Sequence, residues 1–262
     1  MARVEIDVSR PHEARVYDYI LGGKNNYEAD RQVGDNLLKA VPWMPVGAKH
    51  NRAFLRRAVQ FVAGQGIDQF LDIGTGLPTM QNTHEVALSL NPQAKVVYTD
   101  YDPLVLAHAR ALLTGGGTAY VHADLRDPRA ILAAAAQHLD LSKPVAVMLI
   151  AVLHHLLDDD HPVQHVRTLL DAVPSGSYLV LTHATMDFLD EQTAAELGKV
   201  FEGSGMRFWA RSRADVEQFT SGLDLVEPGI VPVTAWRPEH GEVGVPPTAD
   251  GVGHWGAVAL KP

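Results

Sequence analysis

The chain of 262 residues contains no cysteine, which excludes disulfide bonds, cysteine-ligated metal centres and a thiol nucleophile. Positive charge is also scarce, because 22 Lys and Arg stand against 31 Asp and Glu, a formal net charge of −9. This balance argues against a broad nucleic-acid-binding face, which needs clustered cations. No apolar run approaches the ~20 residues that span a bilayer, and the N-terminal segment lacks the apolar core of a secretory signal. We therefore expect a cytoplasmic protein that binds neither nucleic acid nor membrane.

What the chain does contain is typical of a globular protein, with 46% hydrophobic and 20% charged residues. From about residue 69, short β-branched runs alternate with helical segments, which predicts a parallel sheet covered by helices on both faces. The expected strands are 69–73, 95–100, 118–123, 144–150 and 176–182, and the expected helices are 102–113, 161–173, 187–203 and 212–221.

The two ends of the chain differ from this middle part. Residues 1–68 contain no convincing strand but several helices, including one over 48–66 with a continuous apolar face. Near the other end, residues 223–236 and 254–261 are joined by a loop rich in proline and glycine and predict a long antiparallel hairpin. We divide the chain into an N-terminal helical cover, residues 1–66, and an α/β domain, residues 67–262.

The stretch FLDIGTGLPT, residues 70–79, predicts a strand that ends in a glycine turn. Gly74 and Gly76 would let a ligand approach the backbone at the carboxyl end of that strand. The NAD pattern G-x-G-x-x-G fails at Thr79, and the usual S-adenosylmethionine (SAM) pattern G-x-G-x-G fails at Pro78. A turn that needs glycine for its geometry alone is a third interpretation. Other parts of the chain must decide among them.

Carboxylates at the ends of successive strands favour SAM. Asp72 precedes the glycines, Asp100 is placed to accept from ribose hydroxyls, and Asp124 is placed to accept from an adenine amino group. Such acids suit a cationic nucleoside better than a dianionic one. The pyrophosphate of NAD also needs a helix N-terminus directly after the glycines, whereas the predicted cap is Asn82, three residues before Glu85. The sequence therefore favours SAM over NAD.

The motifs D-x-G-x-G, YTDYDP, HADLRDP and AVLHHL resemble the motif series of class I SAM-dependent methyltransferases. A closer resemblance, over nearly the full length, is to an actinobacterial methyltransferase family long catalogued as a domain of unknown function, in which Pro78 is normal. It rests on residues 10–31, 51–59, 69–79, 82–87 and 254–262. The resemblance implies a Rossmann-like sheet of seven strands in the order 3-2-1-4-5-7-6, with strand 7 antiparallel. It also implies SAM as the cofactor and S-adenosylhomocysteine (SAH) as the product.

The N-terminal segment RVYDYILGGKNNYEADR predicts two short helices around Gly22 and Gly23, which would act as a C-cap and a hinge. We expect a mobile cover over the glycine turn, with Tyr19, Lys24 and Tyr27 among its candidate ligand contacts. The alternative is a helical hairpin that buttresses the sheet. Arg52 is either a partner of the SAM carboxylate or a surface residue. The expected cofactor-binding residues are Tyr17, Gly22, Gly23, Asn25, Arg52, Asp72, Gly74, Thr75, Gly76, Asp100, Tyr101, Asp124, Leu125 and Ala151.

The histidine-rich stretch HHLLDDDH, residues 154–161, contains possible metal ligands. Packed leucines and aspartates that introduce the next helix are the better interpretation, and we expect no metal site. His154 and His155 directly follow the fourth strand, where one can line the substrate side, and His183 ends the fifth. If the acceptor must lose a proton, neutral histidine is the natural base, and we hypothesise His154 or His183 in that role.

The predicted function is therefore transfer of the SAM methyl group to a small-molecule acceptor by in-line displacement. A SAM-binding module without catalysis, or with a regulatory role, is the alternative, and an NAD-dependent oxidoreductase is less favoured. No N-P-P-Y motif follows the fourth strand, which argues against methylation of amino groups in DNA bases or glutamine. The acceptor, the atom methylated and the oligomeric state are not specified by the sequence.

Overall fold

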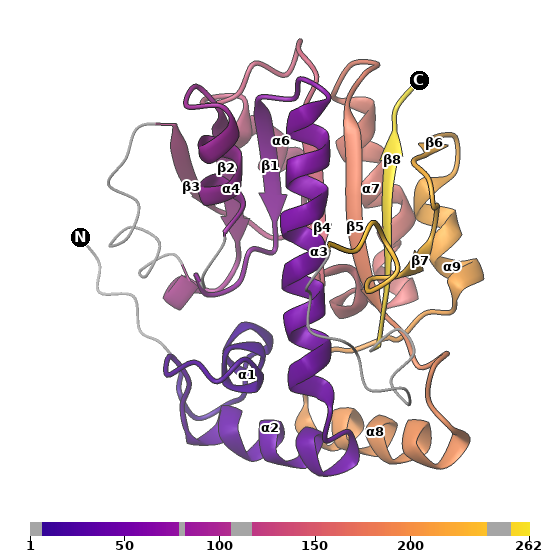
Figure 1. Cartoon of the computed structure of the whole chain (residues 1–262). Helices are drawn as coiled ribbons and strands as arrows, with labels where there is room; N and C mark the ends of the chain where they lie inside the picture. Colours follow the sequence, from indigo (N-terminus) through magenta and orange to yellow (C-terminus); the bar gives the residue numbers. More distant parts are fainter. Residues whose placement is uncertain (1–6, 79–81, 106–116, 240–252) are drawn as a thin grey trace.

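The computed structural model describes residues 7–78, 82–105, 117–239 and 253–262, and its centre is an eight-stranded sheet (Figure 1). The strand order is β3-β2-β1-β4-β5-β8-β6, and β7 also pairs with β8. β1 to β5 are parallel, and β8 runs antiparallel to β5. The strands are β1 (Gln69–Ile73), β2 (Lys95–Asp100), β3 (Thr118–His122), β4 (Ala146–Ile150), β5 (Tyr178–Ala184), β6 (Asp224–Leu225), β7 (Val231–Pro232) and β8 (His254–Leu260).

This arrangement confirms the expected fold class and the expected order of strands, with one addition. The segment 223–236, expected to form a single limb of the hairpin, forms two short strands, β6 and β7, that both pair with β8. Pro228 lies between them and has no backbone N–H to donate, so pairing along the whole limb is interrupted. The sheet therefore has eight strands where the resemblance implied seven.

Helices cover both faces of the sheet, as expected. On one face, α3 (Met44–Gly64) and α4 (Thr83–Leu90) pack on a buried cluster that contains Phe70 of β1 and Met148 of β4. On the other face, α6 (Pro128–Ala135) and α7 (Pro162–Asp171) pack on a cluster that contains Leu71 and Val147. Neighbouring residues of one strand thus face opposite layers, as in a sheet buried on both sides.

The long helix α3 joins the N-terminal part of the chain to the last strand. A Cβ atom on Gly256 of β8 would lie 2.9 Å from Cε2 of Phe54, so glycine allows the helix to approach the strand closely. Phe54 also packs edge-on against the buried Trp236, with 5.4 Å between ring centroids. The buried guanidinium of Arg57 donates to the carbonyl oxygens of Val233 at 2.6 Å and Trp236 at 2.9 Å. α3 is therefore part of the core of the α/β layer.

Most predicted helix starts are confirmed. Asn82 and Glu85 form a capping box at α4, and Ser212 and Asp215 form one at α9 (Arg213–Glu217). The helix expected over 187–203 instead begins after Asp190, whose side chain accepts from the backbone N–H of Thr193. Of the helix expected over 102–113, residues 102–105 are described, and residues 103–105 are helical. The rest of it, and residues 240–252 of the expected long loop, lie outside the described residues.

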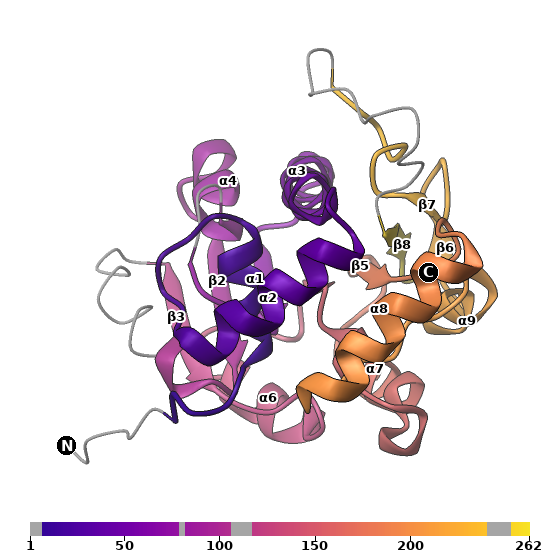
Figure 2. The ribbon, with the colours of Figure 1, turned by 90° about the horizontal axis from the view of Figure 1, so that it is seen from below.

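Three helices lie beyond the carboxyl ends of the parallel strands: α1 (Glu13–Ile20), α2 (Glu28–Ala40) and α8 (Glu191–Ser204). Figure 2 shows them across that end of the molecule, with α1 and α2 side by side. They share an apolar cluster that includes Val16, Leu37 and Leu197. We call α1 and α2 the cover helices. The division of the chain at residues 66 and 67 stays a prediction.

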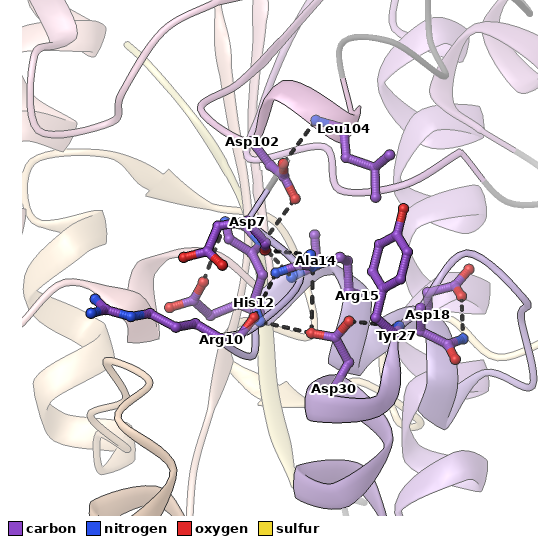
Figure 3. A network of polar contacts seen from close by, with 12 residues as sticks. Asp7, Arg10, His12, Ala14, Arg15, Asp18, Tyr27, Asp30, Asp102 and Leu104 are labelled. Atoms are coloured by element: carbon purple, nitrogen blue, oxygen red, sulfur yellow. Dashed lines mark hydrogen bonds and ion pairs between the residues drawn. The ribbon is translucent and has the colours of Figure 1, made fainter. Parts of the chain in front are cut away.

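One buried carboxylate ties the starts of the two cover helices together (Figure 3). Asp30, fully buried near the start of α2, accepts from the backbone N–H of His12 at 2.9 Å and of Tyr27 at 2.8 Å. The Nε atom of the buried Arg15 lies 3.4 Å from the same carboxylate, and its other nitrogens donate to the carbonyl oxygens of Asp7 and Arg10. The position of α1 on α2 therefore depends on Asp30.

We expect Asp30→Asn to destabilise the protein by about 3–5 kcal/mol, the usual result of leaving one partner of a buried ion pair unpaired. The amide keeps one acceptor but leaves the Arg15 guanidinium without its counter-charge. Asp35→Asn is the matched control, since Asp35 lies on the exposed side of α2 and accepts from the Tyr19 hydroxyl at 2.7 Å. It should change the free energy of unfolding by less than about 0.5 kcal/mol. Urea denaturation followed by circular dichroism measures both, and equal stability of the two variants would contradict the role of Asp30.

Candidate functional site

A cavity opens at the carboxyl ends of β1, β2, β4 and β5 and extends between the cover helices and α8. Its wall on the sheet side consists of residues at the strand ends, including Asp72, Gly74, Asp100 and Ala151. Open α/β sheets bind their ligands at this edge, where the strand order changes direction. In this sheet the change occurs between β1 and β4. The cavity is therefore the candidate functional site.

The glycine turn after β1 has a backbone that only glycine adopts without strain. Gly74 and Gly76 have φ angles of +71° and +65°. A Cβ atom on Gly74 would lie 2.2 Å from Cγ2 of Val152, so a side chain there has no space. A Cβ atom on Gly76 would lie 4.0 Å from Cβ of Ala14, the second residue of α1. The first cover helix therefore lies directly over the glycine turn.

Two buried carboxylates flank this turn. Asp72 is 3% exposed and accepts from the Thr83 hydroxyl at 2.6 Å. Burial raises the pKa of Asp72 to about 6, although that hydrogen bond and the charge of Arg52 both act to lower it. Asp100 accepts from the backbone N–H of Gly76 at 2.8 Å and of Asp102 at 2.9 Å, and burial raises its pKa too. Burial disfavours the charged form of both acids, and a bound cation would offset this desolvation cost.

Asn51 of α3 is a cavity residue that the sequence reasoning missed. Its side chain is 1% exposed, and its amide nitrogen donates to the Tyr17 hydroxyl at 3.1 Å. Its buried Oδ1 atom has no hydrogen-bond partner among the described residues. A buried acceptor left unsatisfied is costly and points to a missing donor. Asn51 is the first residue of the segment 51–59, one of the segments on which the family resemblance rests, so the resemblance could have indicated it as a site residue.

Arg52 and Tyr101, both expected at the site, line the cavity. An Arg52 guanidinium nitrogen donates to Oδ1 of Asn82 at 3.3 Å, which ties the arginine to the start of α4. The Tyr101 hydroxyl donates to the carboxylate of Glu13 at 2.9 Å. Glu13 is a further lining acid that the sequence reasoning missed, and it links the end of β2 to the first cover helix.

Of the expected cofactor-binding residues, the cavity brings together Tyr17, Arg52, Asp72, Gly74, Thr75, Gly76, Asp100, Tyr101 and Ala151. The described lining does not include Gly22, Gly23 or Asn25. These residues belong to the turn after α1, which packs around the Asp18 side chain. The Asp18 carboxylate accepts from the backbone N–H of Asn25 at 2.9 Å, and a Cβ atom on Gly23 would lie 2.1 Å from its Oδ1. These three residues hold the end of α1 in the structure.

The remaining candidates from the same predictions also lie outside the described lining. The Asp124 carboxylate is bound by the side chain of Arg126, two residues along, and Leu125 is buried in the core beneath it. The Tyr19 hydroxyl donates to Asp35 on α2, away from the cavity. Lys24 and Tyr27 are not among the lining residues either.

The structure gives the two predicted bases very different surroundings. His183 is fully buried outside the described lining, and both of its ring nitrogens are bonded. Its Nδ1 donates to the carbonyl oxygen of Ala184 at 2.8 Å, and its Nε2 accepts from Arg211 at 3.1 Å. Burial lowers the pKa of His183 to about 3. His183 is therefore arranged to hold neighbouring segments together, and His154 is the predicted base that faces the cavity.

His154 and His155 both line the cavity but hold opposite tautomers. Nδ1 of His154 accepts from the backbone N–H of Ala184 at 3.4 Å, which places the ring proton on Nε2. Nδ1 of His155 lies 2.9 Å from the carbonyl oxygen of Arg207, which only accepts, so the proton is on Nδ1 and Nε2 carries a lone pair. Burial lowers the pKa of both rings, which keeps them neutral. His154 can thus donate to a ligand, and His155 can accept.

Metal-binding clusters and membrane-spanning helices are both absent from the part of the chain that the structure describes. No group of three or more histidine, aspartate or glutamate side chains is arranged there to hold a metal ion. No helix within those residues has the length and apolar character to cross a bilayer. Two of the aspartates in HHLLDDDH have protein partners, since Asp158 pairs with Arg211 and Asp160 pairs with Arg207.

Comparison with known proteins gives a family and two similar structures. The model of the S-adenosyl methyltransferase family matches residues 1–262. The crystal structure of a DUF574 family protein from Streptomyces avermitilis MA-4680 is 44% identical, with a TM-score of 0.92, over 98% of this chain and 100% of that one. A candidate methyltransferase from Thermobifida fusca YX is 42% identical, with a TM-score of 0.89, over 97% and 96% of the two chains.

A more distant structure shows the fold alone. The N-methyltransferase NodS from Bradyrhizobium japonicum WM9 is 14% identical, with a TM-score of 0.50, over 82% of this chain and 97% of that one. No curated protein matches the sequence.

The raised pKa of Asp72 predicts a pH-dependent gain in stability for Asp72→Asn. The folded value of about 6 lies above the ordinary 3.8, so the wild-type protein loses stability as pH rises through 6. The difference corresponds to roughly 3 kcal/mol at pH 8. Asparagine has no charge to desolvate and still accepts from Thr83. The variant should therefore be more stable than wild type at pH 8 by up to about 3 kcal/mol, and the gain should vanish near pH 4.

Urea unfolding of wild type and variant at pH 4, 6 and 8 measures this difference in free energy. Asp68→Asn is the control, because Asp68 directly precedes β1 on the exposed surface. Its effect should be small and nearly constant with pH. A difference between Asp72→Asn and wild type that does not change between pH 4 and pH 8 would show that Asp72 is not a desolvated acid.

Proposed function

The chain belongs to the S-adenosyl methyltransferase family, and on this premise we propose that it transfers the methyl group of SAM to a small-molecule acceptor bound in the same cavity. The cofactor of the family is SAM. The observation that carries the proposal is the acidic end of the cavity, where Asp72 and Asp100 are buried beside the glycine turn. Carboxylates desolvated in this way favour a ligand that brings positive charge.

The side chains around the turn match the polar groups of SAM. Asp72 and the unpartnered Oδ1 of Asn51 would hold the ammonium group, and Arg52 would pair with the carboxylate. Asp100 uses one lone pair on each oxygen for a backbone N–H, which leaves others for the ribose hydroxyls. The backbone of Gly74 and Gly76 would lie against the nucleoside. An adenine contact from Asp124 would require it to release Arg126.

A dinucleotide fits this end of the cavity less well. Its pyrophosphate would bring two negative charges toward Asp72, Asp100 and Glu13. The nearest described helix after the turn is α4, which begins at Thr83 rather than directly after Gly76. Among the described residues, the helix that follows the turn in the chain therefore does not place its N-terminal backbone donors beside the glycines.

Methyl transfer requires little chemistry from the protein itself. A bond forms between the acceptor atom and the methyl carbon while the carbon–sulfur bond breaks, and its electron pair stays on sulfur. The residues of the cavity would hold the reacting atoms in line. Reactions between groups positioned in this way reach effective molarities of ~10⁵–10⁸ M. The first cover helix, α1, lies over the glycine turn, where it would shield a bound nucleoside from water. The cavity also extends past this end toward α8, which gives an acceptor a place to bind.

Isothermal titration calorimetry with SAH tests the proposed binding site. The wild-type protein should bind SAH, and NAD should give no heat. Asp100→Asn should weaken SAH binding roughly 10- to 100-fold, since it removes the charge from hydrogen bonds to the ribose. Asp68→Asn, with its exposed side chain, should bind SAH as wild type does. Binding of NAD in place of SAH, or SAH binding that is unaffected by Asp100→Asn, would refute the assignment.

A further inference from the structure

Beyond the strand ends the cavity continues between α1, α2 and α8, where its walls are apolar. Figure 2 shows these three helices lying across the same end of the molecule. We call this part the apolar chamber and define it by Ile20, Leu37, Trp43, Leu197, Phe201 and Met206. Apolar surface that faces an open cavity is unfavourable in water, so it is typical of sites that bind apolar ligands.

Charge in the cavity is confined to the other end. The charged residues among its described lining are Glu13, Arg52, Asp72 and Asp100, which lie around the glycine turn and the start of α1. In α8, Leu197 points inward while Glu196 and Lys199 are exposed to solvent. A charged or sugar-like molecule would lose its hydration in the chamber without gaining hydrogen-bond partners. The chamber thus selects against such acceptors.

Four histidines are in the described lining, His12, His154, His155 and His254, and we consider the two that directly follow the fourth strand, His154 and His155, as proton-handling groups. The Arg207 carbonyl holds the His155 ring with its lone pair on Nε2, so this atom can accept from a hydroxyl group. Glu13, also in the lining, is close enough for its negative charge to favour protonated His155. His154 has its proton on Nε2 and can only donate from that atom. A proton acceptor with the negative charge of a carboxylate nearby suits a hydroxyl nucleophile.

We infer that the apolar chamber is the acceptor site and that its substrate is an uncharged, mainly apolar molecule with a hydroxyl group, whose proton passes to Nε2 of His155. This inference rests on the proposed function. As the oxygen–carbon bond forms, the carbon–sulfur bond breaks and leaves its electron pair on sulfur. The hydroxyl proton goes to His155, and the imidazolium is stabilised by the Glu13 carboxylate. His155 therefore replaces His154 and His183 as the assigned base.

Binding to the SAH-saturated protein tests the inference without the natural acceptor. The probes are 2-naphthol, which is apolar and carries a hydroxyl, 2-methoxynaphthalene, which lacks the donatable proton, and glucose, which is polar. Calorimetry should show that 2-naphthol binds about tenfold more tightly than 2-methoxynaphthalene, since only the former can donate to His155. Glucose should not bind. Comparable binding of glucose and 2-naphthol would overturn the assignment of the substrate class.

Variants locate the two parts of the site. Leu197→Gln should weaken 2-naphthol binding at least tenfold and leave SAH affinity unchanged, because it makes the chamber polar. Leu90→Gln is its control, since Leu90 is 53% exposed at the end of α4. His155→Phe should abolish the preference for 2-naphthol over 2-methoxynaphthalene while SAH still binds. His138→Phe, at an exposed histidine, should preserve that preference.

The outcomes separate this inference from the proposed function. If SAH does not bind, the proposed function fails and the acceptor assignment fails with it. If SAH binds and 2-naphthol does not, or if Leu197→Gln has no effect on 2-naphthol, the chamber is not the acceptor site. If the preference survives in His155→Phe and is lost in His154→Phe, His155 is not the proton acceptor.

Discussion

The site depends on carboxylates that are buried before any ligand binds. Asp72 and Asp100 sit at neighbouring strand ends, where hydrogen bonds from Thr83 and from backbone N–H groups fix their orientation but do not offset the whole cost of desolvation. That cost is the electrostatic reason for a positively charged ligand at this end of the cavity. Fixed carboxylates of this kind reorganise little when the ligand arrives, and that preorganisation stabilises a bound cation more than mobile surface acids would.

The cover helices connect the glycine-turn end of the cavity to the apolar chamber. Asp30 fixes the start of α1 against α2, and Glu13 in the first turn of α1 accepts from Tyr101 at the end of β2. The same Glu13 lines the cavity together with His155, while Ile20 at the other end of α1 lines the apolar chamber. A shift of α1 would therefore change the surroundings of the glycine turn, of His155 and of the apolar chamber together.

Periodicity and short motifs predicted those features of the structure that depend on residues close together in the chain. Apolar runs separated by helices predicted the parallel sheet, whereas its strand order was implied by the family resemblance. The capping box of Asn82 and Glu85 lies within four residues of chain. Glu13 and Asn51 were missed as lining residues, and the tautomer of His155 was not predicted, because each depends on contacts between distant segments. For Gly22 and Gly23 the pattern suggested a hinge over the ligand, which stays a prediction, and the structure adds that their turn packs around the Asp18 side chain. Sequence periodicity does not encode such tertiary contacts.

The adjacent histidines show why the residue type alone does not assign a catalytic role. His154 and His155 occupy one short turn, but Ala184 presents a donor to the first and Arg207 an acceptor to the second. Arg211 braces that turn through the carbonyl oxygens of Leu153 and Leu156, and it also donates to His183. His183 thus bonds the same arginine that holds the turn carrying the other two rings. The backbone partners of each imidazole, rather than its closeness to the strand end, decide which one can accept a proton.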